Sequence, residues 1–146
     1  MDIRTTAQPS PVFRLTIGPS FDMVSVARHF VCDAFVVLGA DARGDEAALL
    51  TSETVSNAIR HAQTPITLAV MRTGDRVRVA VHDHDSSSVL RPSPRSAEIR
   101  PGDVTPGGHG LHIIDALADD WGVEAVDGDG KVVWFAITVP SAEPAA

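Results

Sequence analysis

The chain has 146 residues, of which 44% are hydrophobic and 21% charged, so we expect one globular domain with a core of its own. The formal net charge of −7 argues against direct binding to nucleic acid or to an anionic membrane surface, because both repel an acidic protein. Cys32 is the only cysteine, which excludes an intramolecular disulfide and a thiolate-based metal cluster and fits a reducing cytoplasm. We expect neither a signal peptide nor a membrane span, since no stretch has the required apolar length.

The chain begins with a predicted strand and a predicted helix. Residues 12–17 alternate in V-F-R-L-T-I and contain enough β-branched side chains to predict a strand. From Ser20 or Asp22 to about Leu38, hydrophobic residues recur at helical spacing. Gly39 follows in the position that glycine favours at the end of a helix.

A second helix is predicted from Asp41, a suitable N-cap, to about Ala62, because Pro65 disfavours helical geometry in the residue before it. Glu53 and Asn57 are four residues apart in this helix and therefore share a face. A carboxylate and an amide in a notch bordered by apolar surface suit a charged ligand. The alternative is an ordinary solvated pair on the surface of a helix.

The middle of the chain predicts a β-hairpin from residues 66–71 and 76–83, joined by a short connection that contains a glycine. Asp83 follows Val81 at two-residue spacing, so its carboxylate is expected on the core side of the sheet. A buried carboxylate is costly unless it accepts hydrogen bonds. Asp83 therefore needs a donor, either the amino group of a ligand or a loop amide.

Residues 86–106 contain four prolines and three arginines and predict a long loop, either a lid that meets phosphates or a solvated connection. The run G-G-H-G-L at residues 107–111 then leads into an apolar helical pattern. Glycines at the start of a helix leave backbone N–H groups free at the positive end of its dipole, where anions bind. A flexible hinge before a helix is the alternative interpretation.

The end of the chain predicts a second hairpin, with strands at residues 121–126 and 131–139 and a tight turn at 127–130. The whole pattern indicates an α/β two-layer sandwich, in which a mostly antiparallel sheet of about five strands has three helices on one face. Residues 12–139 form the expected domain, with a lid at about 85–107. Residues 1–11 and 140–146 are the expected disordered tails.

Several of these motifs together resemble the GHKL ATPases, whose nucleotide-binding domain has the Bergerat fold. They are E-x-x-x-N-A-x-x-H-A at residues 53–62, the strand-ending Asp83, the lid, and G-G-H-G-L. More narrowly, S-E-x-x-x-N-A-x-R-H-A, D-A-L-A-D-D-W-G-V at 115–123 and G-K-V-V-W-F at 130–135 resemble the bacterial anti-sigma-factor serine kinases. The resemblance covers about residues 12–139, nearly the whole chain.

The resemblance implies that the protein binds ATP and Mg²⁺. Asn57 would hold Mg²⁺ through its side-chain oxygen, and Glu53 would orient or deprotonate the serine hydroxyl of a partner protein. Asp83 would accept a hydrogen bond from the amino group of adenine. The residues that it implies around the phosphates are Arg60, His61, Gly107, Gly108, His109, Gly110 and Leu111.

The same resemblance implies a cytoplasmic regulator of transcription. It would sequester a sigma factor and phosphorylate a serine of an anti-anti-sigma protein of the STAS type, and relatives with this pattern are commonly homodimers. Phosphoryl transfer depends on positioning and charge neutralisation more than on covalent catalysis, and these residue types supply both.

Two departures from the family pattern leave a second function open, a sigma-binding module without kinase activity. His84 and Asp85 follow Asp83 where relatives often have a small residue that admits the purine. Val132 stands where many relatives have a threonine that supports the adenine end.

A zinc-binding protein is a further alternative. His82 and His84 share a strand face, and His109 and His112 are three residues apart in the predicted helix, so four imidazoles could meet around a metal ion. Histidines on a strand face are, however, more often solvent-facing.

Overall fold

The computed structural model describes residues 11–85 and 109–140, except for the side chains of 109–112. Three α-helices, α1 (Val24–Val37), α2 (Gly44–His61) and α3 (His109–Leu117), accompany the strands β1 (Val12–Ile17), β2 (Ile66–Thr73), β3 (Arg76–Asp83), β4 (Asp120–Ala125) and β5 (Lys131–Thr138). Short 3₁₀ turns, Phe21–Met23 and Asp41–Arg43, precede α1 and α2. The expected tails and almost all of the expected lid lie outside the described residues.

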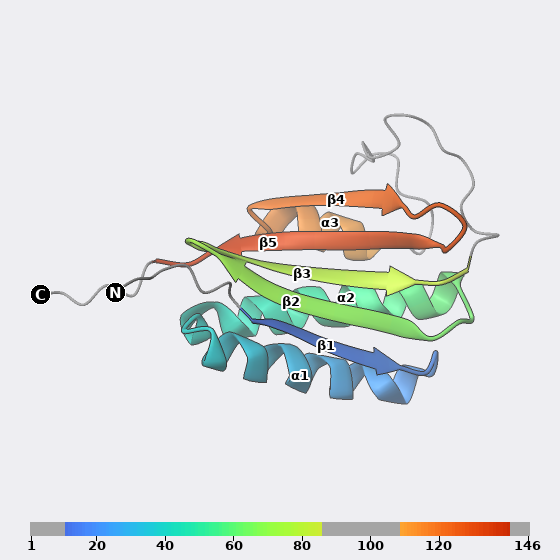
Figure 1. Cartoon of the computed structure of the whole chain (residues 1–146), viewed down its shortest axis with the longest axis horizontal. Coiled ribbons are helices and arrows are strands. Elements are labelled where there is room, and N and C mark those ends of the chain that lie inside the picture. The colour runs from blue at the N-terminus through green and yellow to red at the C-terminus, as the bar shows by residue number, and fades with distance from the viewer. Residues whose placement is uncertain (1–10, 86–108, 141–146) are drawn as a thin grey trace, which may run out of the picture.

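The strands form one sheet in the order β1-β2-β3-β5-β4, and every neighbouring pair is antiparallel. Figure 1 shows α1, α2 and α3 on the same side of this sheet, with α2 between the other two. The predicted α/β two-layer sandwich is therefore confirmed. The other face of the sheet carries no helix in the described part of the chain.

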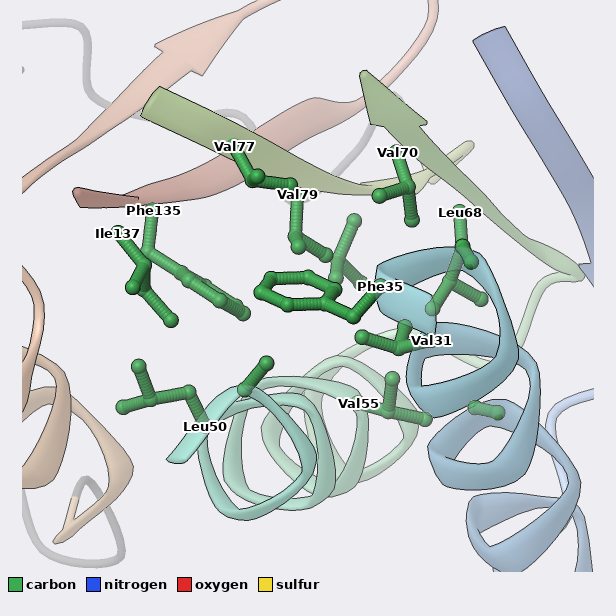
Figure 2. Packing of buried hydrophobic residues seen from close by; sticks show 14 of the residues in the cluster. Val31, Phe35, Leu50, Val55, Leu68, Val70, Val77, Val79, Phe135 and Ile137 are labelled. Carbon is green, nitrogen blue, oxygen red and sulfur yellow. The ribbon is translucent and has the colours of Figure 1, made fainter. Parts of the chain in front are cut away.

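The core lies between this sheet and the helices, because alternate residues of the central strands face the helical layer. Figure 2 shows the packing around Phe35 of α1, which is fully buried. The strand residues that pack in this cluster include Leu68, Val70, Val77, Val79, Phe135 and Ile137, all with no exposed surface. Burial of each such side chain stabilises the fold by about 1.5–3 kcal/mol, so this cluster fixes the helices on the sheet.

Helix α2 packs against α1 on one side and α3 on the other. In Figure 2, Val55 lies on the side of α2 that faces α1, whereas Leu50 lies on the opposite side. Both are fully buried, so α2 cannot rotate about its axis without exposing one of them. This fixed orientation determines where the polar residues of α2 lie.

Two local predictions differ from the structure. The loop of the first hairpin has two residues, Gly74 and Asp75, rather than four, since the β2–β3 pairing continues to Thr73 and Arg76. Asp41 is not the N-cap of α2 but lies in the 3₁₀ turn before it. The cap position is Arg43, which makes no side-chain capping bond, and Asp45 and Glu46 supply the negative charge that the start of a helix favours.

Candidate functional site

A polar stripe runs along α2 on the side turned away from α1. Asn57 comes seven residues, two helical turns, after Leu50 and therefore lies on the same side of α2 as that buried leucine. Glu53 lies one turn before Asn57 and His61 one turn after it. Glu53 and Asn57 are both half-buried, as expected for side chains beside the α2–α3 contact.

The amide oxygen of Asn57 is held by a neighbouring cation. The guanidinium of Arg60, an exposed residue, donates to Asn57 Oδ1 over a long distance of 3.4 Å. A neutral amide oxygen with a carboxylate one turn away is a suitable ligand for a hard cation such as Mg²⁺. Asn57 therefore fits the role of a metal ligand, and a bound ion would replace the contact with Arg60.

Asp83 is buried at the end of β3, with 2% of its surface exposed, and its side chain faces the helical layer as predicted. The ammonium group of Lys131 donates to Asp83 Oδ2 at 2.8 Å, and the backbone amide of Asp85 donates to Oδ1 at 3.1 Å. These two donors offset the cost of burying the carboxylate. A loop amide is one of the two donors that the sequence leaves open for Asp83, whereas Lys131 is not predicted from the sequence.

The turn between β4 and β5 packs directly onto Asp83. Gly130 has a φ of +76°, and a Cβ at this position would lie 2.1 Å from the carbonyl oxygen of Asp83. Only glycine fits there, because a side chain would be both strained and in collision with the backbone. The sequence places this residue in a turn and in the G-K-V-V-W-F motif, but it does not predict the contact with Asp83.

His61 connects the stripe on α2 with the Asp83–Lys131 pair. The pKa of its imidazole is lowered, mainly because the ring is partly buried, although most of the residue is exposed. The positive charges of Lys131 and Arg60 lower the pKa further. The charge of Asp83 opposes them. The C-terminal end of α2 therefore lies within electrostatic reach of the buried carboxylate.

Helix α3 begins at His109, so the glycine run does lead into a helix, as predicted. Gly110 and Leu111 belong to its first turn. Gly107, Gly108 and the side chains of His109–His112 lie outside the described residues. Their role in phosphate binding stays a prediction, as do the roles of Arg60 and His61.

Of the residues that depart from the family pattern, Asp85 contacts Asp83 through its backbone amide, whereas the side chains of His84 and Val132 lie on the opposite face of the sheet. Asp83 pairs with Lys131, so Val132, the next residue, points to the opposite face. His84 is also on that face, where its ring contacts Thr67 and His82. The side chains of His84 and Val132 therefore do not crowd the surroundings of the buried carboxylate.

The model of the histidine kinase-like ATPase domain family matches residues 20–137, which include α1, α2, Asp83 and α3. No curated protein matches the chain. Among the helices in residues 11–85 and 109–140, none has the length and hydrophobicity that crossing a membrane requires. Because the family match covers most of the sequence, the chain belongs to the histidine kinase-like ATPase domain family.

Proposed function

We propose that the protein is an ATP-dependent anti-sigma factor with serine kinase activity. It would sequester a sigma factor in the cytoplasm and phosphorylate a serine of a STAS-type anti-anti-sigma protein. ATP binding, usually with Mg²⁺, is the common property of histidine kinase-like ATPase domains. The more specific function is supported by the motifs that resemble the anti-sigma kinases.

The observation that carries the proposal is the arrangement of α2 beside the end of β3. The stripe of Glu53, Asn57 and His61 leads along α2 toward the buried Asp83. Asn57 would hold Mg²⁺, which supplies neutralising charge to the phosphates when bound. Glu53, one turn away, would accept the proton of the attacking serine hydroxyl or orient that hydroxyl.

Asp83 retains the capacity to bind a base although Lys131 already contacts it. A carboxylate has about four acceptor positions, and among the described residues the Lys131 ammonium group and the Asp85 amide use two of them. The exocyclic amino group of adenine could donate to a third. A guanine carries a carbonyl oxygen at that ring position, which a carboxylate would repel.

Phosphate transfer to the anti-anti-sigma protein tests the kinase activity. Purified protein with labelled ATP and Mg²⁺ is mixed with STAS-type proteins from the same organism, and phosphoserine is measured. We expect transfer by the wild type and a rate lower by roughly 10²–10⁴-fold for Glu53→Gln, which removes the base but keeps the size of the side chain.

The two functions left open by the sequence give different results in this assay. Absence of phosphoserine, together with ATP binding and sigma-factor binding in separate titrations, would favour a sigma-binding module without kinase activity. Glu53→Gln with the same rate as the wild type would contradict the role assigned to Glu53.

A further inference from the structure

A second group of polar side chains lies on the open face of the sheet, on the other side from Asp83. His82 is on the open face of β3, His84 follows the end of that strand, and Asp129 lies in the turn between β4 and β5. The two imidazole ring centroids are 4.0 Å apart. One ligand atom from each of the three residues lies within 4.8 Å of the others.

The three side chains already point toward one another. His84 Nδ1 is 2.8 Å from Asp129 Oδ1, and His82 Nε2 is 3.7 Å from Asp129 Oδ2. His82 Nε2 also contacts the backbone carbonyl oxygen of Asp129 at 2.7 Å. Their side chains are 21%, 32% and 47% exposed for His82, His84 and Asp129, so water could reach the cluster and complete a coordination shell.

Two imidazole nitrogens and one carboxylate oxygen form a donor set that Zn²⁺ takes in proteins, with water as the fourth ligand. Mg²⁺ and Ca²⁺ prefer oxygen ligands, so the two histidines select against them. These ligands come from β3 and from the β4–β5 turn, which β-sheet pairing already holds together. Little further ordering of the chain is needed for an ion to bind.

The hydroxyl group of Thr67 contacts the second ring nitrogen of His84 and holds the imidazole in an orientation that suits a metal ligand. His84 Nε2 lies 3.1 Å from Thr67 Oγ1, which in turn lies 3.2 Å from Thr16 Oγ1. Without a metal ion, the carboxylate of Asp129 can only accept, so Nδ1–H of the neutral ring donates to Oδ1 and Nε2 accepts from the Thr67 hydroxyl. A bound ion would displace the Nδ1 proton to water, and Nε2–H would then donate to Thr67. Metal-binding histidines usually have their second nitrogen engaged in this way, which fixes the tautomer of the ring.

We propose that His82, His84 and Asp129 bind one transition-metal dication of the Zn²⁺ type. The ion would join the end of β3 to the β4–β5 turn. It would lie on the open face of the sheet, next to the point where Gly130 contacts Asp83. This site differs from the four-histidine zinc site considered from the sequence, because Asp129 takes part and neither His109 nor His112 is needed. The proposal does not depend on ATP binding.

Calorimetric titration of chelator-treated, tag-free protein with ZnCl₂ tests the site. We expect one Zn²⁺ per chain for the wild type and at least tenfold weaker binding for Asp129→Asn and for His84→Gln. Thr67→Val should weaken binding by roughly 10–100-fold, as loss of a hydrogen bond to a ligating histidine does. Asp127→Asn, an exposed acid in the same turn, and His29→Gln, an exposed histidine of α1, serve as controls that bind like the wild type.

Two results would overturn the proposal. One is the absence of saturable Zn²⁺ binding by the wild type, which would leave the cluster as a hydrogen-bonded clamp. The other is equal affinity in the wild type, Asp129→Asn and His84→Gln, which would place the ion elsewhere. Circular dichroism of each metal-free variant shows whether it is folded, and saturating Zn²⁺ should raise the Tm of the wild type, but not of Asp129→Asn, by roughly 5 °C.

Discussion

Two glycines in the turn between β4 and β5 have left-handed backbone angles, but only one of them is packed against the site. Gly128 has a φ of +72°, and no packed neighbour from residues 11–85 or 109–140 comes within 4 Å of the position that a Cβ would take. Gly130 has nearly the same backbone angle, and its Cβ would collide with the backbone of Asp83. Comparison of the two positions therefore separates backbone strain from steric conflict.

Gly130→Ala should destabilise the protein much more than Gly128→Ala. The left-handed conformation alone costs about 1 kcal/mol for alanine, so Gly128→Ala should lower the free energy of unfolding by about that amount. The collision at Gly130 should bring the total there to roughly 3 kcal/mol and lower the Tm by roughly 10 °C. Thermal and urea unfolding of the two variants measure these changes. Equal destabilisation by Gly128→Ala and Gly130→Ala would show that the contact with Asp83 is unimportant.

The surroundings of Asp83 show what a sequence can reveal about single residues. Two-residue alternation along β3 predicts that its carboxylate faces the core, and the structure confirms this. Lys131 could not be identified as its partner, because that pairing requires the register between β3 and β5. The same register places Val132 on the open face, which alternation within its own strand could not reveal.

At the scale of elements, the orientation of α2 determines which polar residues can meet a ligand. The sequence predicts the helix and the shared face of Glu53 and Asn57, because both follow from helical periodicity. Its start was predicted wrongly, since Asp41 is a good capping residue by type but lies in a separate 3₁₀ turn. A cap depends on backbone angles that residue type alone does not determine.

The junction between α3 and β4 is tied to the rest of the fold by Asp119. Its carboxylate accepts a hydrogen bond from the Thr138 amide at 2.7 Å, and Arg43 Nη1 lies 3.8 Å away. The hydrogen bond with Thr138 lowers the pKa of Asp119, and the positive charges of Arg43 and Arg76 act in the same direction, while burial opposes them. The charged carboxylate therefore stabilises the junction.

Asp119→Asn should destabilise the protein at neutral pH but not at strongly acidic pH. A carboxyl group with a lowered pKa in the folded state contributes stability above its ordinary pKa and loses that contribution as the pH falls through the lowered value. Because the Asp119 side chain is 39% exposed, we expect the substitution to lower the free energy of unfolding by about 1 kcal/mol or less at pH 7. This difference should shrink toward pH 3. Urea unfolding at several pH values, with Asp127→Asn as control, measures this difference.

A pH-independent difference between wild type and Asp119→Asn would contradict the role of the charged form. It would indicate that only the geometry of the hydrogen bond to Thr138 matters. Equal stability at neutral pH would show that the contact contributes nothing.

At the scale of the molecule, the sheet brings two groups of residues to the same end on opposite faces. Asp83, Lys131 and the end of α2 lie on the helical side, whereas His82 and His84 lie on the open side. The sequence predicts five strands and one helical layer, since hydrophobic alternation and turn residues specify them. It does not predict that β5 lies between β3 and β4, because strand order depends on contacts between distant segments.

The central claim is that Asn57 on α2 and Asp83 on β3 belong to one nucleotide site. A measurement of ATP binding tests this claim most directly. Titration of fluorescent ATP in the presence of Mg²⁺ is carried out on the wild type, Asn57→Ala, Asp83→Asn and the control Asp127→Asn, with circular dichroism to verify folding. We predict that the wild type and Asp127→Asn bind alike and that each of the other two folded variants loses tenfold or more in affinity. Unchanged affinity in folded Asn57→Ala and Asp83→Asn would contradict the account.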